Sequence, residues 1–239
     1  MIEIGGLQKT TLIDYPGRVA CTVFFISCNF RCPFCYSAEL VLPEKIRNQP
    51  RISEKYFFDF LKERRNLLEG ICITGGEPTV HKDLPVFIKK IKQLGYLVKL
   101  DTNGSNPEML KKLIDKKLID YVAMDIKAPK DKYEKAVGKK ININNIEKSI
   151  EILKEGKVDW EFRTTIVSSI HSKEDIVKIA KWIGGNPLTG LGQGKYFLQN
   201  FRAEKTINPK FEKIKPCSQD YLLEIQKAIS PFFEDVQIR

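Results

Sequence analysis

Short apolar segments alternate with helical segments along this 239-residue chain, and this alternation constrains the fold more than any other feature. The apolar segments are rich in β-branched and aromatic residues, as expected for strands that are buried on both faces. They lie at residues 19–27, 71–74, 96–101, 121–127, 160–167 and 195–200. Strands that alternate with helices are typical of βαβ units on a parallel sheet. Because each unit needs about 30 residues, a closed eight-unit barrel does not fit, and we predict an α/β fold, a partial (β/α)6 TIM-like barrel.

Helical segments follow the predicted strands, and one more closes the chain. Ser53 is a typical N-cap for a helix that contains Phe57 and Leu61. Further helices are predicted at about 84–94, 107–116, 145–154, 173–183 and 218–229, and a Gly-rich connection precedes the last strand. No linker marks a second domain. We therefore expect one domain over 1–239, made of a lead-in strand or loop at 1–18, the partial barrel at 19–200, and a C-terminal extension with its closing helix at 201–239.

The chain carries 40 Lys and Arg against 30 Asp and Glu, which gives a net charge of +10. The basic residues are spread along the chain and cluster locally only in helical segments, where a solvated outer face explains them, so we expect no nucleic-acid partner. The N-terminus lacks the pattern of a signal peptide, and no run reaches ~18 apolar residues. We therefore expect a cytoplasmic protein without a membrane partner, in which the six cysteines serve ligation or burial and not disulfides.

Three of those cysteines, Cys28, Cys32 and Cys35, form a C-x3-C-x2-C array directly after the first predicted strand. Three thiols without a nearby fourth thiol or His leave one coordination position free, which suits an iron-sulfur cluster that binds a ligand at its open iron. The alternative is a zinc site with Cys72 or Cys217 as a distant fourth ligand.

Polar residues and glycines follow the other predicted strands. Chemistry in α/β barrels sits at the C-terminal ends of the strands, so these residues are candidates for one common site. They are Gly75, Gly76 and Glu77 in TGGEP, Asp101 and Thr102 in DTNG, Asp125 and Lys127 in MDIK, Arg163 on the fifth strand, and Gln199 and Asn200 after the sixth. The glycines let the backbone turn sharply and approach a ligand, and Glu77 then presents a carboxylate to a cationic group.

The charged members of this set have two interpretations. Asp101, Asp125 and Lys127 place two carboxylates and a cation at neighbouring strand ends, and a structural salt bridge is the alternative to a ligand site. Arg163 lies in an otherwise apolar strand, where a charge is costly to bury unless it meets an anion, either a ligand or a core carboxylate. The two histidines both precede predicted helices and receive no role; His81 is expected to be an exposed helix start.

Two of these motifs together resemble a known superfamily. The cysteine array after the first strand and GGEP after the second are similar to those of the radical S-adenosylmethionine (SAM) superfamily. The lead-in GLQKTTLIDYPGRVACTVFFISCNFRCPFCY, with DTNG and DIK, resembles the activating enzymes of glycyl radical proteins, in particular those of anaerobic ribonucleotide reductase and pyruvate formate-lyase. The resemblance covers residues 5 to about 167 well and the remainder only loosely.

The resemblance implies two cofactors and assigns residues to them. Cys28, Cys32 and Cys35 would hold a [4Fe–4S] cluster whose fourth iron takes the amino and carboxylate groups of SAM. Phe34 would lie against the adenine, with core packing as the alternative. The other implied SAM contacts surround the methionine part of the cofactor. At the amino group they are Gly75, Gly76 and Glu77, and around the methionine end, where they can also hold a monovalent cation, they are Asp101, Thr102 and Asp125. Lys127 is implied near the carboxylate, Arg163 is a second candidate for the carboxylate, and Asn200 or Gln199 stands in place of a His found in some relatives.

The function implied by the resemblance is reductive cleavage of SAM to a 5′-deoxyadenosyl radical and installation of a glycyl radical on a partner enzyme, most directly anaerobic ribonucleotide reductase. Cluster potentials reach down to about −700 mV, which implies a flavodoxin or ferredoxin as the electron donor. Two alternatives stay open: a radical SAM enzyme that acts on a small molecule or modified nucleotide, and a non-catalytic zinc or iron-sulfur protein that binds nucleic acid, which only the positive charge favours.

Overall fold

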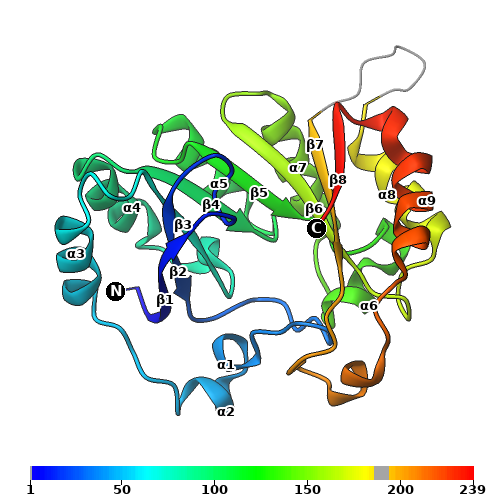
Figure 1. The fold of residues 1–239 in the computed structure, drawn as a ribbon, viewed down its shortest axis with the longest axis horizontal. Coiled ribbons are helices and arrows are strands. Elements are labelled where there is room, and N and C mark those ends of the chain that lie inside the picture. Colours follow the sequence, from blue (N-terminus) through cyan, green and yellow to red (C-terminus); the bar gives the residue numbers. More distant parts are fainter. Residues whose placement is uncertain (1, 186–193) are drawn as a thin grey trace.

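The computed structural model describes residues 2–185 and 194–239, and within these ranges it has one eight-stranded sheet in sequential strand order (Figure 1). β1 (Ile4–Thr11) pairs antiparallel with β2 (Ala20–Phe25), and the later neighbours are all parallel. The strands that follow β2 are β3 (Gly70–Gly75), β4 (Leu97–Thr102), β5 (Tyr121–Asp125), β6 (Asp159–Ile166), β7 (Lys195–Asn200) and β8 (Asp235–Ile238). The six predicted strands are β2 to β7, which confirms the parallel α/β architecture.

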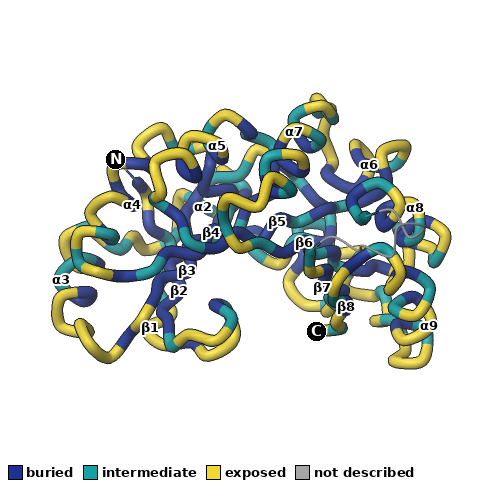
Figure 2. The backbone as a smooth tube through the Cα atoms, turned by 90° about the horizontal axis from the view of Figure 1, so that it is seen from above, coloured by how far each residue is buried: buried dark blue, intermediate teal, exposed yellow. Residues whose placement is uncertain are grey.

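β1 and β8 lie at the two edges of the sheet and extend it beyond the six predicted strands. The lead-in was expected to be a strand or a loop, and most of it forms the strand β1. β8 was not predicted because it has only four residues, of which Val236 alone is buried, so its sequence carries no clear alternation. Seen from above in Figure 2, the buried strands follow an arc from β1 to β8, and the largely exposed helices lie outside it.

The longer helices begin and end within two residues of the predicted positions. They are α3 (Glu54–Glu63), α4 (Leu84–Gln93), α5 (Pro107–Asp115), α7 (Ile143–Lys154), α8 (Lys173–Ile183) and α9 (Gln219–Ile229). The predicted cap is confirmed, because the Ser53 side chain accepts a hydrogen bond from the backbone N–H of Tyr56 at 3.1 Å. Short helical turns were not predicted because one turn shows no periodicity; they are α1 (Ala38–Val41), α2 (Pro43–Ile46), α6 (Tyr133–Val137), η1 (Pro78–Val80), η2 (Lys130–Lys132), η4 (Pro209–Lys213) and η5 (Ser230–Phe232).

Helices cover one face of the strands, where the apolar side chains form the core, and the barrel interior meets the other face, which carries polar side chains such as those of Lys99 and Arg163 (Figure 1). Val23 on β2, Ile73 on β3 and Val122 on β5 are fully buried. Each such side chain contributes about 1.5–3 kcal/mol relative to exposure. This packing makes the strands a rigid frame for the loops at their C-terminal ends.

The register of the parallel strands brings the candidate residues to one side of the sheet. We call residues 26–35, which carry the cysteine array, the cysteine loop. Phe25 pairs with Gly75, so the cysteine loop and the TGGEP turn leave the sheet side by side. Asp125 pairs with Arg163, so the MDIK segment begins directly beside that guanidinium. Parallel strands all end at the same edge, and the motifs therefore converge although up to about 170 residues separate them in the chain.

The first part of the C-terminal extension, residues 201–214, crosses the cysteine loop; we call it the C-terminal strap. Ile207 donates its N–H to the carbonyl of Cys35 at 3.0 Å, and Asn208 donates its N–H to the carbonyl of Pro33 at 2.9 Å. These two hydrogen bonds join the strap to the backbone of the cysteine loop. The sequence predicted an extension here but not this contact.

Two remaining expectations concern other parts of the chain. Within the described ranges, no helix has the length and apolar character needed to cross a membrane. The predicted Gly-rich connection falls mostly on residues 186–193, which lie outside the described residues.

Candidate active site

The three cysteines of the array line one cavity of about 250 Å³ at the C-terminal ends of the strands. Their loop is held in shape by its own backbone and by Arg31, whose guanidinium donates hydrogen bonds to the carbonyls of Cys28 and Phe30, each at 2.6 Å. The N–H of Phe30 points at the Cys28 sulfur at 3.3 Å, and the N–H of Cys35 donates to the carbonyl of Cys32 at 3.0 Å. The thiol positions are therefore ordered by the fold.

α6 supports the outer side of this loop. Arg31 donates its N–H to the carbonyl of Val137 at 2.8 Å. Gly138 ends the helix with φ +67°, and a Cβ there would lie 2.4 Å from the Arg31 carbonyl oxygen. Only glycine permits that approach in this backbone conformation. This support was not predicted from the sequence, although a glycine that follows a short helical run is a signal that could have indicated it.

Burial controls the protonation of the thiols. It raises the pKa of Cys28 and of Cys32 to about 12 and also raises the pKa of Cys35. These thiols hold their protons at neutral pH unless a metal displaces them, as a coordinated metal does. All three are free of disulfides, as expected.

The donor set fits a cluster held by three thiolates better than a closed zinc site. The cavity wall includes no His and no fourth cysteine. Cys72 instead lies on β3 with its sulfur 3.8 Å from Lys99 Nζ, and Cys217 pairs through its backbone with Asn200. Over the described ranges, no three His, Cys, Asp or Glu side chains are arranged to hold a metal ion directly. The alternative of a distant fourth zinc ligand therefore has no support in this cavity.

The TGGEP turn runs against the start of the cysteine loop. Gly75 has φ +112°, and a Cβ on it would lie 2.5 Å from backbone atoms of Phe25. A Cβ on Gly76 would lie 1.9 Å from the carbonyl oxygen of Ser27. The N–H groups of Gly76 and Glu77 donate to the carbonyls of Phe25 and Ser27, both at 2.8 Å. Both glycines are thus required by close contact with the cysteine loop, whether or not a ligand also approaches.

Glu77 lies on the cavity wall and is only 1% exposed. Its Oε1 accepts from the N–H and hydroxyl of Thr79, at 3.1 and 2.5 Å, and from the hydroxyl of Thr102 at 2.7 Å. Its Oε2 accepts from the N–H of Asn103 at 2.6 Å. Burial raises the pKa of Glu77 despite these donors, so a cationic ligand at the cavity would stabilise its charged form.

Asn103 connects three motifs, a role that the sequence did not reveal. Besides its N–H contact with Glu77, its side-chain Nδ2 donates to the side-chain Oδ1 of Asn29 at 3.0 Å. Asn29 in turn donates to the hydroxyl of Ser105 at 2.7 Å. The DTNG turn therefore holds both Glu77, the carboxylate predicted to meet the SAM amino group, and the cysteine loop.

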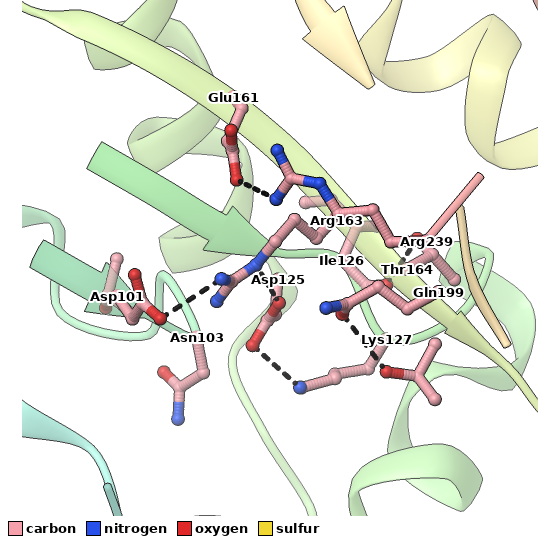
Figure 3. A network of polar contacts seen from close by, with 12 residues as sticks. Asp101, Asn103, Asp125, Ile126, Lys127, Glu161, Arg163, Thr164, Gln199 and Arg239 are labelled. Atoms are coloured by element: carbon pink, nitrogen blue, oxygen red, sulfur yellow. Dashed lines mark hydrogen bonds and ion pairs between the residues drawn. The ribbon is translucent and has the colours of Figure 1, made fainter. Parts of the chain in front are cut away.

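Arg163 lies between two carboxylates, as Figure 3 shows. It donates from Nη1 to Asp101 at 3.0 Å and from Nε to Asp125 at 2.9 Å. Lys127 contacts the other oxygen of Asp125 at 3.1 Å. Burial alone would raise the pKa of Asp125, but Arg163 and Lys127 lower it to about 2. The sequence left two possible anions for Arg163, a ligand or a core carboxylate, and the structure shows core carboxylates. Asp101, Asp125 and Lys127 take part in salt bridges, which was one of their two interpretations.

Lys127 lies on the cavity wall and is held from behind by two residues that sequence reasoning did not assign. Its N–H donates to the hydroxyl of Tyr133 at 3.4 Å, and its carbonyl lies 2.8 Å from Nε2 of His171. Nδ1 of His171 accepts from the N–H of Val167 at 3.1 Å, so Nε2 carries the proton. Burial lowers the pKa of His171, which keeps the ring neutral.

Two predictions about individual residues change. Asn200 uses its side-chain amide to pair with the backbone of Cys217, and Gln199, the alternative, lies on the cavity wall instead. The prediction for His81 as an exposed helix start was wrong: its ring is half-buried and Nε2 contacts the carbonyl of Ile26 at 2.8 Å, because α4 begins only at residue 84. Phe34 lies on the cavity wall and is 4% exposed, so both of its interpretations stay compatible with its position.

Residues 22–183 match the radical SAM superfamily, and the chain belongs to that superfamily. It is an enzyme of the radical SAM class, and this class implies a [4Fe–4S] cluster and SAM as its cofactors. The fold agrees: a domain of pyruvate-formate lyase-activating enzyme from Bacteroides vulgatus superposes with a TM-score of 0.56 at 16% identity, covering 71% of this chain and 98% of that one.

Sequence comparison narrows the class to relatives of the activating enzymes. The chain is 34% identical to the "Putative glycyl-radical enzyme activating enzyme MJ1227" of Methanocaldococcus jannaschii, over 99% of this chain and 95% of that protein. A shorter similarity, 30% identity over 58% of this chain and 60% of the relative, links it to the 7-carboxy-7-deazaguanine synthase of Thermococcus kodakarensis.

Proposed function

We propose that this enzyme installs a glycyl radical on a partner enzyme, and that the partner is an anaerobic ribonucleotide reductase. The observation that carries the activating function is the nearly full-length similarity to the "Putative glycyl-radical enzyme activating enzyme MJ1227". The choice of partner rests on the resemblance of the lead-in sequence to the activating enzymes of that reductase. The lead-in up to the cysteine loop, which resembles those enzymes in sequence, forms β1, β2 and the wall of the cavity.

When bound, the cluster and SAM supply one-electron cleavage of SAM to methionine and a 5′-deoxyadenosyl radical. The side chains of the cavity support a SAM site beside the cysteines. Glu77 presents a buried carboxylate for the amino group, and Lys127 presents a cation for the carboxylate. Phe34 offers an apolar wall for the adenine, and Thr102 and Gln199 complete the polar wall.

Glycyl-radical formation tests this proposal directly. The anaerobically reconstituted enzyme, dithionite and SAM are incubated with the partner, and the partner is examined by EPR. We expect a glycyl radical on anaerobic ribonucleotide reductase and none when Cys32→Ala replaces the enzyme. Formation of 5′-deoxyadenosine without a radical on either this reductase or pyruvate formate-lyase would contradict the proposal.

A radical SAM enzyme that acts on a small molecule or modified nucleotide is the second candidate. The shorter similarity to 7-carboxy-7-deazaguanine synthase favours it. Mass spectrometry of reactions with small nucleotides and pterins separates the two candidates, because a new small product without a radical on protein would support this second function.

The electron donor belongs to the same proposal, and we expect a flavodoxin or ferredoxin. The net charge of +10 favours an acidic partner, since complementary charge accelerates protein encounter. Reduction by such a donor should therefore slow as ionic strength rises, whereas reduction by a neutral chemical reductant should not. Equal salt dependence of both would contradict this part of the proposal.

A further inference from the structure

A buried lysine lies behind the carboxylates of the candidate active site. Lys99 on β4 is 2% exposed, and its Nζ contacts Oδ1 of Asp101. The other oxygen of Asp101 receives Arg163 Nη1. Both oxygens of Asp125 are likewise matched, one by Arg163 Nε and one by Lys127 Nζ. Every oxygen of these two carboxylates thus contacts a positively charged side chain.

This arrangement does not fit the monovalent cation that the resemblance implied between Asp101 and Asp125. Hard cations bind oxygen ligands, and a carboxylate attracts them most strongly when no cationic side chain already neutralises it. Here three cationic side chains, Lys99, Arg163 and Lys127, face two carboxylates, which leaves one net positive charge. A further cation at the same carboxylates would meet like charges at close range.

Lys99 is charged in this position. Burial alone would lower the pKa of Lys99, but the neighbouring carboxylate of Asp101 outweighs it and the net shift is upward. The pKa of Asp101 is lowered in turn, because Arg163 and Lys99 overcome its burial. The Lys99 ammonium is therefore a permanent neighbour of Asp101 that needs no uptake from solution.

We propose that Lys99 is a positioning residue that replaces a bound monovalent cation: it holds the Asp101 carboxylate at the cavity wall, and SAM cleavage is independent of alkali-metal ions. The inference rests on the SAM-binding role proposed for the cavity and not on the identity of the partner. Since Asp101 lines the cavity while Lys99 lies beneath it, Lys99 acts through Asp101 and not by contact with the cofactors.

SAM cleavage is measured as 5′-deoxyadenosine formed by the cluster-loaded enzyme with a chemical reductant, which requires no partner. The wild-type rate is compared in potassium, sodium and choline chloride at equal ionic strength. We expect the rates in the three salts to agree within about twofold. If the site needed an ion and its absence displaced the reacting groups by ~1 Å, the rate would fall roughly a hundredfold. A wild-type rate that drops tenfold or more without alkali ions, on the same scale, overturns the inference.

Lys99→Met tests the replacement itself. Without the ammonium, one oxygen of Asp101 loses its partner, so the variant should be slow in choline and recover in potassium or sodium. The matched control is Lys92→Met, which removes a lysine that pairs with Asp120 at 2.6 Å away from the cavity. The control should show no dependence on alkali ions. A Lys99→Met enzyme as fast as wild type in choline overturns the inference, and so does one that stays slow in all three salts.

A second measurement uses the cluster-free protein and needs no activity. Thermal unfolding of the wild type should give the same midpoint in potassium and in choline, whereas Lys99→Met should unfold at a higher temperature in potassium. The inference is overturned if potassium raises the unfolding midpoint of the wild type above its value in choline by more than it does for Lys92→Met. Failure of the proposed function would look different, since it would show as normal SAM cleavage without a radical on the partner.

Discussion

Replacing Arg163 by Met should destabilise the folded protein strongly, because this guanidinium alone bridges the two active-site carboxylates. The side chain is 11% exposed and contacts Asp101 at 3.0 Å and Asp125 at 2.9 Å. Removing one partner of a buried ion pair costs about 3–5 kcal/mol, and here one oxygen of each carboxylate loses its partner although Lys99 and Lys127 still contact the other oxygens. For a chain of this size, about 2–4 °C per kcal/mol converts that loss to roughly 6–20 °C in the unfolding midpoint.

The pH dependence of this loss follows from the same carboxylates. In the wild type the pKa of Asp125 lies near 2, below its usual 3.8, so its stabilising effect is present above about pH 4 and is lost as the pH falls through 2. In Arg163→Met the carboxylates face one another with less positive charge, which raises their pKa. The wild type therefore loses this stabilisation below about pH 4, and the destabilisation caused by Arg163→Met should be smaller at pH 3 than at pH 8.

Urea unfolding of the cluster-free protein at both pH values measures the effect. The control is Arg18→Met, which removes an ion pair with Glu69 whose side chains are 46% and 47% exposed. Such a surface pair contributes at most about 1 kcal/mol. If Arg163→Met costs no more than Arg18→Met, or costs the same at pH 3 and pH 8, the proposed charge balance of the site is wrong.

Three further changes probe the site. Gly76→Ala should displace the TGGEP turn, since its Cβ would lie 1.9 Å from a carbonyl oxygen of the cysteine loop, and iron content after reconstitution should fall. The control Gly6→Ala, whose Cβ would come no closer than 3.4 Å to a side-chain atom, should retain iron. Burial lowers the pKa of His171, so the stability of the wild type should decline as the pH drops below 6.5. Thermal unfolding measured from pH 8 to 5 should show a smaller decline for His171→Gln. Cys32→Ala should abolish SAM cleavage while circular dichroism stays that of the wild type; retained cleavage would remove Cys32 from the cluster site.

Local sequence patterns predicted most of the sheet and its helices. The apolar runs of β2 to β7 and the cap at Ser53 are local signals, and tertiary structure agreed with them. Elements without such signals were missed. β8 has four residues of which only Val236 is buried, and α6 is a single turn whose position matters only because Gly138 approaches the cysteine loop.

The candidate residues also followed from sequence, because chemistry at strand ends and the C-x3-C-x2-C spacing are visible in one dimension. The sequence alone determined which residues meet at the C-terminal edge of the sheet: Cys28, Cys32 and Cys35 with Glu77, Asp125 and Lys127. Only the tertiary structure decided how these charges are paired. Arg163 had two possible anions and Asn200 competed with Gln199, and both choices depend on register and on contacts across 17 to 62 residues of chain. Lys99 and Asp101 are two residues apart on β4, so the alternation of side chains along a strand already places them on one face. The fold adds Arg163 from β6 and largely buries all three charges, because contacts between strands depend on register and packing.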